Sequence, residues 1–154
     1  MSGGLPGLQR KYGRPHVLSD PFHDNTPAGL RDLLSKADSD LDRGDFRTLL
    51  GPHVPAGTYE EVVYFLPLAF DFIRTDPAVA LDLCSSLVWF CSKYNRELSA
   101  DKAVEAARRE LLGLVHQWTS RFDVTHFDRP MCLAKGWFKL QYFDLGLPRF
   151  GGQV

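Results

Sequence analysis

The residues best suited to chemistry in this sequence lie in one short stretch, which contains Asp123, His126 and Asp128. Two carboxylates and an imidazole are side chains that can coordinate a metal ion. The same residue types are also common in loops, where they cap helices and stabilise turns. We favour this second interpretation and predict no metal site. The alternative function that we keep is a small enzyme, or a ligand- or metal-binding sensor, that uses this loop.

Two cysteines are the other candidate ligands, because thiolates bind zinc. Cys84 and Cys91 are seven residues apart in an apolar stretch, which on a helix separates their Cα atoms by about 10 Å along the axis. That separation is too long for a disulfide. We therefore expect thiols in the core, and no disulfide with Cys132 in a reducing compartment.

Common catalytic motifs are absent from the sequence. It contains no P-loop pattern, no GxGxxG, no HExxH, no CxxC and no GxSxG. The five histidines are scattered along the chain, and a pocket lined by Tyr64, Trp89 and Tyr94 is the only other place where we would look for a ligand. We predict that the chain is not an enzyme and needs no cofactor.

Composition narrows the class of protein further. The 154 residues are 44% hydrophobic and 24% charged, as expected for one globular domain. The formal net charge of −1 argues against nucleic-acid binding, which needs a basic excess. No apolar run reaches the ~20 residues of a membrane span. The first residues, MSGGLPGLQRKYGRP, lack the apolar core of a signal peptide, so we expect a cytoplasmic protein.

The stretch from Thr58 to Tyr94 predicts two consecutive apolar helices around which the fold is organised. Thr58 and Glu61 have the spacing of a capping box, which marks the start of the first helix. Pro67 removes one backbone donor inside that helix and predicts a kink near Val63. An acid followed by a proline at 76–77 marks the start of the second helix. This second helix is apolar around its circumference, so we expect it to be central.

Shorter signals predict the other elements. We expect a helix at Pro27–Asp42, ended by Gly44, and a short helical turn at Phe46–Leu50. A connection from Asn95 to Ala100 leads to a helix at Ala100–Phe122, which Ser99 caps. We expect a last helix within Pro130–Leu145, for which a strand is the alternative. Closely spaced Gly and Pro predict an irregular arm over residues 1–26, and residues 147–154 form an irregular tail. The fold class is therefore all-α, a single-domain bundle of four or five helices over residues 27–146. The predicted core contains Leu66, Phe70, Leu83, Leu87, Leu111 and Trp118.

Charge is distributed unevenly along the chain. Between Asp20 and Glu61 there are nine acids and four bases, a net charge of −5, whereas residues 1–19 carry three bases and no acid. Such a segment is either an ordinary solvated surface or a docking surface for a basic partner.

The run TYEEVVYFLPLAFDFI resembles a pattern in small helical bacterial proteins, in which an acid-rich helix start precedes an aromatic residue, Leu, Pro and a second aromatic residue. Some of these proteins resemble immunity proteins, which neutralise polymorphic toxins. The resemblance spans about forty residues, from Thr58 to Asp101, and includes no catalytic residue.

This resemblance implies a cytoplasmic protein-binding module, most concretely an immunity protein that binds a cognate bacterial toxin and occludes its basic active-site cleft. The candidate partner-binding residues are the acids near the predicted helix ends and two aromatic residues beside them, as possible anchors. They are Asp38, Asp42, Asp45, Phe46, Tyr59, Glu60 and Glu61.

Overall fold

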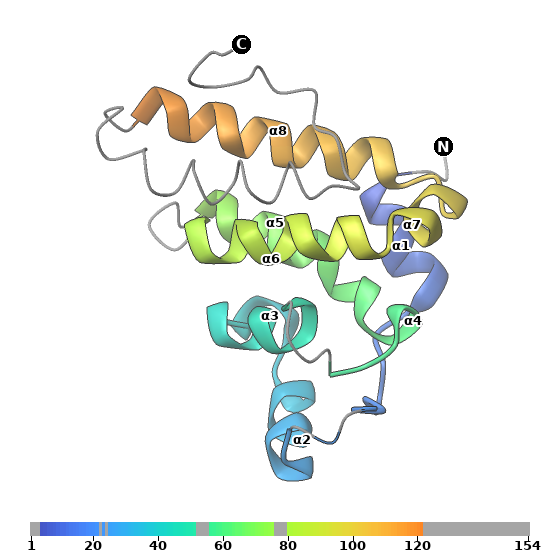
Figure 1. The fold of residues 1–154 in the computed structure, drawn as a ribbon. Coiled ribbons are helices and arrows are strands. Elements are labelled where there is room, and N and C mark those ends of the chain that lie inside the picture. The colour runs from blue at the N-terminus through green and yellow to red at the C-terminus, as the bar shows by residue number, and fades with distance from the viewer. Residues whose placement is uncertain (1–3, 22, 24, 52–55, 76–79, 122–154) are drawn as a thin grey trace.

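A computed structural model describes residues 4–21, 23, 25–51, 56–75 and 80–121, and within these residues all regular secondary structure is helical (Figure 1). The elements are α1 (Leu5–Tyr12), α2 (Pro27–Ser35), the 3-10 turn η1 (Asp38–Asp40), α3 (Arg43–Leu50), α4 (Tyr59–Val62), the 3-10 turn η2 (Val63–Phe65), α5 (Leu66–Thr75), α6 (Ala80–Lys93), α7 (Asn95–Ala100) and α8 (Val104–Arg121). The predicted all-α class is confirmed. Two of the predicted helices, Pro27–Asp42 and the first of the two apolar helices, are each divided into shorter elements.

Helix α6 is the central element. It packs against α3, α5, α7 and α8, and Figure 1 shows α8 running along one side of it while α3 lies on the other. Leu83, Leu87, Phe90 and Cys91 on α6 are fully buried. The prediction that the second apolar helix is central is therefore confirmed.

The kink predicted from Pro67 is present as the turn η2, which separates α4 from α5. Pro67 is the second residue of α5, a position at which a helix does not need its missing N–H. The predicted cap of α4 is also present, because the Glu61 carboxylate accepts a hydrogen bond of 2.8 Å from the backbone N–H of Thr58. The predicted start of α6 at 76–77 lies outside the described residues.

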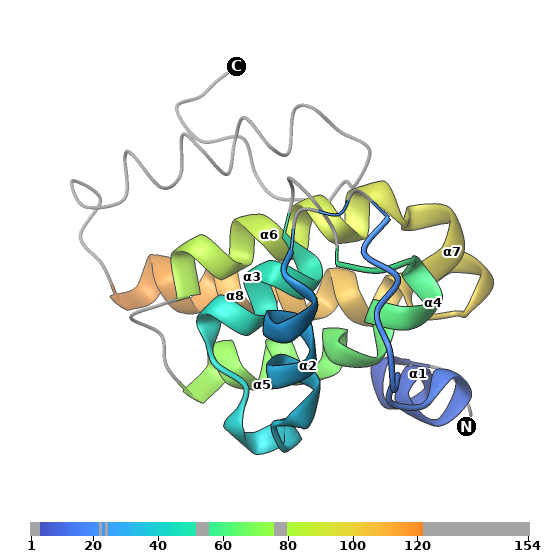
Figure 2. The same ribbon diagram turned by 90° about the horizontal axis from the view of Figure 1, so that it is seen from below.

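The prediction of an irregular arm over residues 1–26 is wrong for residues 5–12, which form α1. The breakers that suggested irregular structure are the boundaries of this helix. Pro6 lies in its first turn, and Gly13 follows its end with a φ of 70°, a conformation that favours glycine. Leu5 and Leu8 are buried where α1 packs against η2 and α5. Figure 2 shows α1 beside α4 at the same end of the molecule.

The helix predicted at Pro27–Asp42 begins as expected, since the Thr26 hydroxyl accepts a hydrogen bond from the N–H of Gly29 at 3.0 Å. It ends early, at Ser35, because the Arg14 guanidinium binds the carbonyl oxygens of Leu34 (2.6 Å) and Lys36 (2.5 Å). The prediction that Gly44 ends this helix is wrong.

Gly44 instead lies in the first turn of α3, a helix that begins at Arg43 after the N-cap residue Asp42. An aspartate followed three residues later by a second acidic residue forms the reciprocal capping pair of this helix. The short helical turn predicted at Phe46–Leu50 is therefore the second half of α3.

The connection predicted between Asn95 and Ala100 is a helix, α7, and α8 begins at Val104 rather than at Ala100. Ser99 lies inside α7 and does not cap α8. At the end of α7, the N–H of Lys102 donates to the carbonyl of Ser99 (3.0 Å) and the N–H of Ala103 to that of Leu98 (2.8 Å). This is the hydrogen-bond pattern of a Schellman motif, and Lys102 takes its left-handed conformation with a φ of 59°.

Five of the six predicted core residues are buried. Leu66, Phe70, Leu83, Leu87 and Leu111 are each at most 1% exposed. The side chain of the sixth, Trp118, lies outside the described set, as do the predicted last helix and the tail. None of the helices that the structure describes has the length and the apolar character needed to cross a bilayer.

Candidate functional site

The structure divides the predicted partner-binding residues between two places. Asp38, Asp42, Asp45 and Phe46 lie on η1 and α3, or immediately before α3, whereas Tyr59, Glu60 and Glu61 lie on α4. Helices α3 and α4 are apart in both views of the ribbon (Figures 1 and 2). The seven residues therefore do not form one continuous site.

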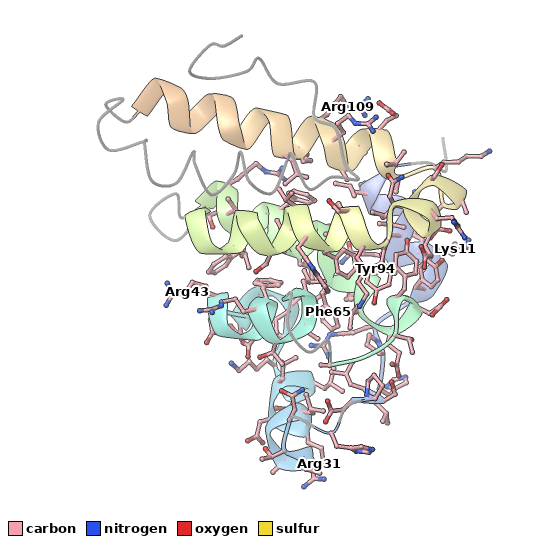
Figure 3. The ribbon with its side chains drawn as sticks, viewed as in Figure 1. Lys11, Arg31, Arg43, Phe65, Tyr94 and Arg109 are labelled. Atoms are coloured by element: carbon pink, nitrogen blue, oxygen red, sulfur yellow. The ribbon has the colours of Figure 1, made fainter. Side chains whose placement is uncertain are left out.

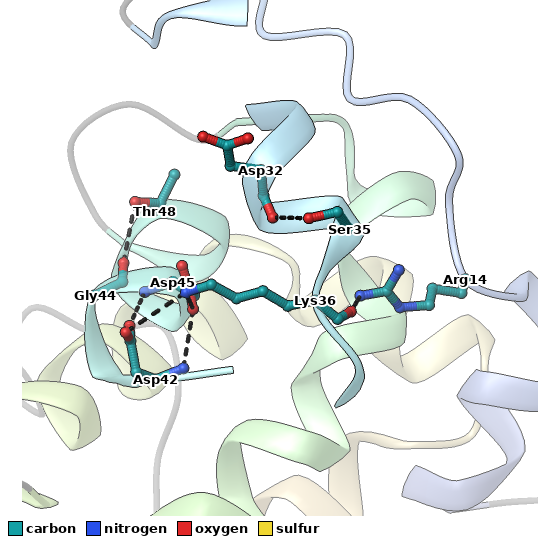
Figure 4. A network of polar contacts seen from close by, with 8 residues as sticks. All are labelled: Arg14, Asp32, Ser35, Lys36, Asp42, Gly44, Asp45 and Thr48. Carbon is teal, nitrogen blue, oxygen red and sulfur yellow. Dashed lines mark hydrogen bonds and ion pairs between the residues drawn. The ribbon is translucent and has the colours of Figure 1, made fainter. Parts of the chain in front are cut away.

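Asp42 and Asp45 form a capping pair that Lys36 joins (Figure 4). The N–H of Asp45 donates to Asp42 Oδ1 at 2.9 Å, and the N–H of Asp42 donates to Asp45 Oδ2 at 3.0 Å. Lys36 Nζ lies 2.7 Å from Asp45 Oδ2 and 3.6 Å from Asp42 Oδ2. The hydrogen bond from the Asp45 backbone and the nearby ammonium of Lys36 hold the pKa of Asp42 below its ordinary value. Asp42 is therefore ionised at neutral pH.

Asp38 uses both carboxylate oxygens within the molecule. Arg14 Nε donates to Asp38 Oδ1 at 3.0 Å, and the Tyr64 hydroxyl donates to Asp38 Oδ2 at 2.7 Å. Arg14 also closes the end of α2, so Asp38 connects the segment after α1 with η1 and η2. Asp38 therefore stabilises the fold.

The two predicted aromatic anchors are not on the surface. Phe46 is 1% exposed and packs against Phe72, with ring centroids 5.4 Å apart. Tyr59 is 4% exposed. The prediction that either ring is an available anchor is wrong, because both rings face the core.

Glu60 and Glu61 differ in their surroundings. Glu60 is exposed. Glu61 Oε1 accepts from Thr58 N and from the Ser19 hydroxyl at 2.7 Å. Partial burial opposes ionisation of Glu61, but these hydrogen bonds outweigh it and hold its pKa below the ordinary value. Glu61 thus holds the segment around Ser19 against the start of α4.

The segment from α2 to α3 retains some exposed carboxylates. It has four bases and five acids, a net charge of −1, so the −5 of the longer sequence segment is not concentrated here. Asp32 and Asp40 are exposed and make no side-chain hydrogen bond or ion pair with another residue in the described part of the chain. The side chain of Asp42 is 65% exposed. We refer to Asp32, Asp40 and Asp42 together as the acidic edge.

A cluster that the sequence did not suggest lies at the other end of the molecule, around Asp101. Its carboxylate accepts hydrogen bonds from Lys11 Nζ (2.6 Å), the Tyr12 hydroxyl (2.6 Å) and the Tyr59 hydroxyl (2.8 Å). The side chain is only 4% exposed. Figure 3 labels Lys11 where α1 and α7 meet. Burial opposes ionisation of Asp101, but the three donors outweigh it and hold its pKa below the ordinary value.

This cluster is a connection between helices rather than an acid–base pair. Burial, and then the hydrogen bond to Asp101, raise the pKa of Tyr59 far above its ordinary value. The pKa of Tyr12 is raised for the same reasons. Both phenols therefore stay protonated at neutral pH and act as donors. Asp101 ties α1 and α4 to the end of α7.

A surface cleft of about 390 Å³ opens beside this cluster, between α1 and the end of α7. Charged residues line much of it, and small residues leave it open. The lining residues are Gly7, Leu8, Arg10, Lys11, Ala100, Asp101 and Lys102. Three cations and one carboxylate face this space.

The three aromatic candidates for a ligand pocket, Tyr64, Trp89 and Tyr94, are all half-buried. The Tyr64 hydroxyl binds Asp38, whereas the Tyr94 ring packs on Tyr59 with centroids 5.2 Å apart. Lys93 Nζ lies 4.9 Å from the centre of the Trp89 ring. Lys93 Nζ also lies 5.2 Å from the centre of the Tyr94 ring, so Trp89 and Tyr94 share this cation, whereas Tyr64 binds Asp38.

The structure describes only part of the two sets of candidate metal ligands, the cysteines and the loop with Asp123, His126 and Asp128. Cys91 is buried, as expected for a core residue. The side chains of Cys84 and Cys132, and the loop with Asp123, His126 and Asp128, lie outside the described residues. Among residues 4–121, as far as they are described, no group of three His, Cys, Asp or Glu side chains is placed to hold a metal ion.

Comparison of this chain with protein-family models, with curated protein sequences and with solved structures finds no match in any of the three.

Proposed function

We propose that this chain is a protein-binding module, most concretely an immunity protein that binds a toxin and covers its basic active-site cleft through the acidic edge. The resemblance of the run from Thr58 to Ile73 is the reason for considering this class of protein. The acidic edge differs from the set expected from the sequence, because Asp38, Asp45 and Glu61 stabilise the fold and Phe46 and Tyr59 are buried.

This proposal rests on the exposure and the fixed position of the Asp42 carboxylate. Its carboxylate is fixed by the N–H of Asp45 and is 65% exposed. Lys36 forms an ion pair with both carboxylates, and its Nζ lies 2.7 Å from Asp45 Oδ2 but 3.6 Å from Asp42 Oδ2. Much of the negative charge of Asp42 therefore faces solvent from a rigid position, and a cationic partner would not have to order this side chain on binding.

Asp32 and Asp40 add two exposed charges on the neighbouring elements α2 and η1. Charges of this kind mainly accelerate association and orient the partner, and salt weakens their effect. A partner with a basic cleft, as expected of a toxin that acts on nucleic acids or nucleotides, has the complementary charge.

Co-expression with the product of the neighbouring gene tests this function. If that product is toxic alone, we expect the wild-type chain to restore growth. The triple variant Asp32→Asn, Asp40→Asn, Asp42→Asn should protect less well, and Asn at position 42 keeps the helix cap intact. The matched control, Asp71→Asn with Glu97→Gln and Glu105→Gln, removes three carboxylates elsewhere and should protect fully. A neighbouring product without toxicity or binding would contradict the proposal.

A further inference from the structure

The cleft between α1 and the end of α7 has the residues of an anion site. Arg10 and Lys11 come from the last turn of α1, and Lys102 follows α7. We propose that this cleft binds the phosphate group of a small ligand through Arg10, Lys11 and Lys102. The proposal is independent of the acidic edge and of the function proposed above.

The charges of the cleft are only partly balanced. Lys11 is paired with Asp101, which is the only acid among the lining residues. Arg10 and Lys102 are exposed and form no ion pair with another residue that the structure describes. The lining thus carries a net charge of +2, which matches a phosphate dianion. The guanidinium of Arg10 can also donate two parallel hydrogen bonds to such a group.

The backbone conformation of Lys102 is a second observation that supports a binding site here. The position after the C-cap of a helix in a Schellman motif needs a left-handed residue, and glycine is preferred there because a Cβ atom makes this conformation costly. This chain instead places a lysine there, with a φ of 59°. Residues held in such unfavourable backbone conformations cluster at functional sites. Here the side chain lines the cleft.

The size of the cleft sets the class of ligand. Its volume of about 390 Å³ lies in the range of small-molecule sites. Gly7 and Ala100 contribute little bulk to the lining, which leaves room beside the phosphate. Inorganic phosphate and a small organic phosphate share the chemistry that the cations recognise, and the two sources can be separated by experiment.

The test is a titration followed by the backbone amide NMR signals of the whole chain, at constant ionic strength. The probes are inorganic phosphate, AMP and glucose 6-phosphate. We expect saturable shifts centred on Gly7, Ala100 and Lys102. Tighter binding of AMP or glucose 6-phosphate would identify an organic phosphate as the ligand, whereas equal binding of all three would identify the phosphate group alone.

Three variants show whether the cleft is the site. Arg10→Gln and Lys102→Gly should each weaken phosphate binding about tenfold, as expected for the loss of a charge-assisted hydrogen bond. Lys102→Gly should at the same time raise the unfolding midpoint, because glycine relieves the left-handed strain, so weaker binding would not reflect unfolding. Arg96→Gln removes an exposed cation of α7 outside the cleft and should leave binding unchanged. Absence of saturable shifts at the cleft, or an equal loss in Arg96→Gln, would overturn the proposal.

Discussion

The hydroxyl of Tyr59 donates a hydrogen bond of 2.8 Å to Asp101, which lies 42 residues further along the chain. The same carboxylate binds Tyr12 and Lys11 of α1. One buried aspartate thus joins the N-terminal helix, the start of α4 and the end of α7. This relationship explains why residues that looked like an irregular arm are part of the folded body.

Replacing Tyr59 by Phe should lower the free energy of unfolding by about 1–2 kcal/mol, because the variant removes one donor from the buried Asp101 carboxylate. Denaturant unfolding followed by circular dichroism measures this loss. Tyr94→Phe is the matched control, since Tyr94 packs in the same aromatic cluster without a hydroxyl hydrogen bond to any other described residue. Equal losses in the two variants would show that the hydroxyl of Tyr59 contributes nothing specific.

Asp101 should make part of the stability depend on pH. Its pKa in the folded chain is held below the ordinary value of 3.8. A lowered pKa contributes stability that is complete above the ordinary value and is lost as the pH falls through the folded value. The stability difference between the wild type and Asp101→Asn should therefore be constant above about pH 5 and shrink below about pH 4. Urea unfolding at several pH values checks this, and a difference that persists unchanged down to pH 2 would refute it.

Leu87→Ala should cost about 2–5 kcal/mol of stability, because this side chain is fully buried at the centre of α6. Val17→Ala is the control, since Val17 is 73% exposed and its truncation should change stability by less than about 0.5 kcal/mol. Chemical denaturation of both variants gives the two values. A cost below about 0.5 kcal/mol at Leu87 would contradict the central position of α6.

Two glycine substitutions should change the stability of the fold in opposite directions. A Cβ atom on Gly51 would lie 2.1 Å from the carbonyl oxygen of Arg47, so Gly51→Ala must move backbone and should cost about 1–3 kcal/mol. A Cβ atom on Gly113 meets no atom within 4 Å, and alanine is the better helix former. Gly113→Ala should therefore stabilise the chain by about 0.5–1 kcal/mol. Thermal unfolding midpoints that moved in the same direction would contradict this local geometry.

Sequence patterns predicted the apolar centre of the fold correctly, because local spacing determines it. The capping residues Thr58 and Glu61, the kink before Pro67 and the buried face of α6 all depend on neighbours within one or two helical turns. The end of α2 depends on a distant residue. Arg14 binds the carbonyls of Leu34 and Lys36, and no local pattern indicates such a contact.

The candidate site was less predictable, for the same reason. Whether an aspartate is free or used within the fold depends on partners far along the chain, such as Arg14 and Tyr64 for Asp38. The Asp101 cluster joins Tyr12 to a residue 89 positions away, so its chemistry is visible only in three dimensions. The clearest local signal for helix α1 was Pro6 followed by Gly13, because this spacing fits the two boundaries of one helix.

The association rate between this chain and the neighbouring gene product, measured by stopped flow at low and high salt, tests the central claim most directly. We expect the wild type to associate faster at low salt. The variant Asp32→Asn, Asp40→Asn, Asp42→Asn should associate about tenfold more slowly at low salt and show a weaker salt dependence, while the control with Asp71, Glu97 and Glu105 replaced behaves like the wild type. If the acidic-edge variant associates at the wild-type rate at low salt, the acidic edge is not the docking surface.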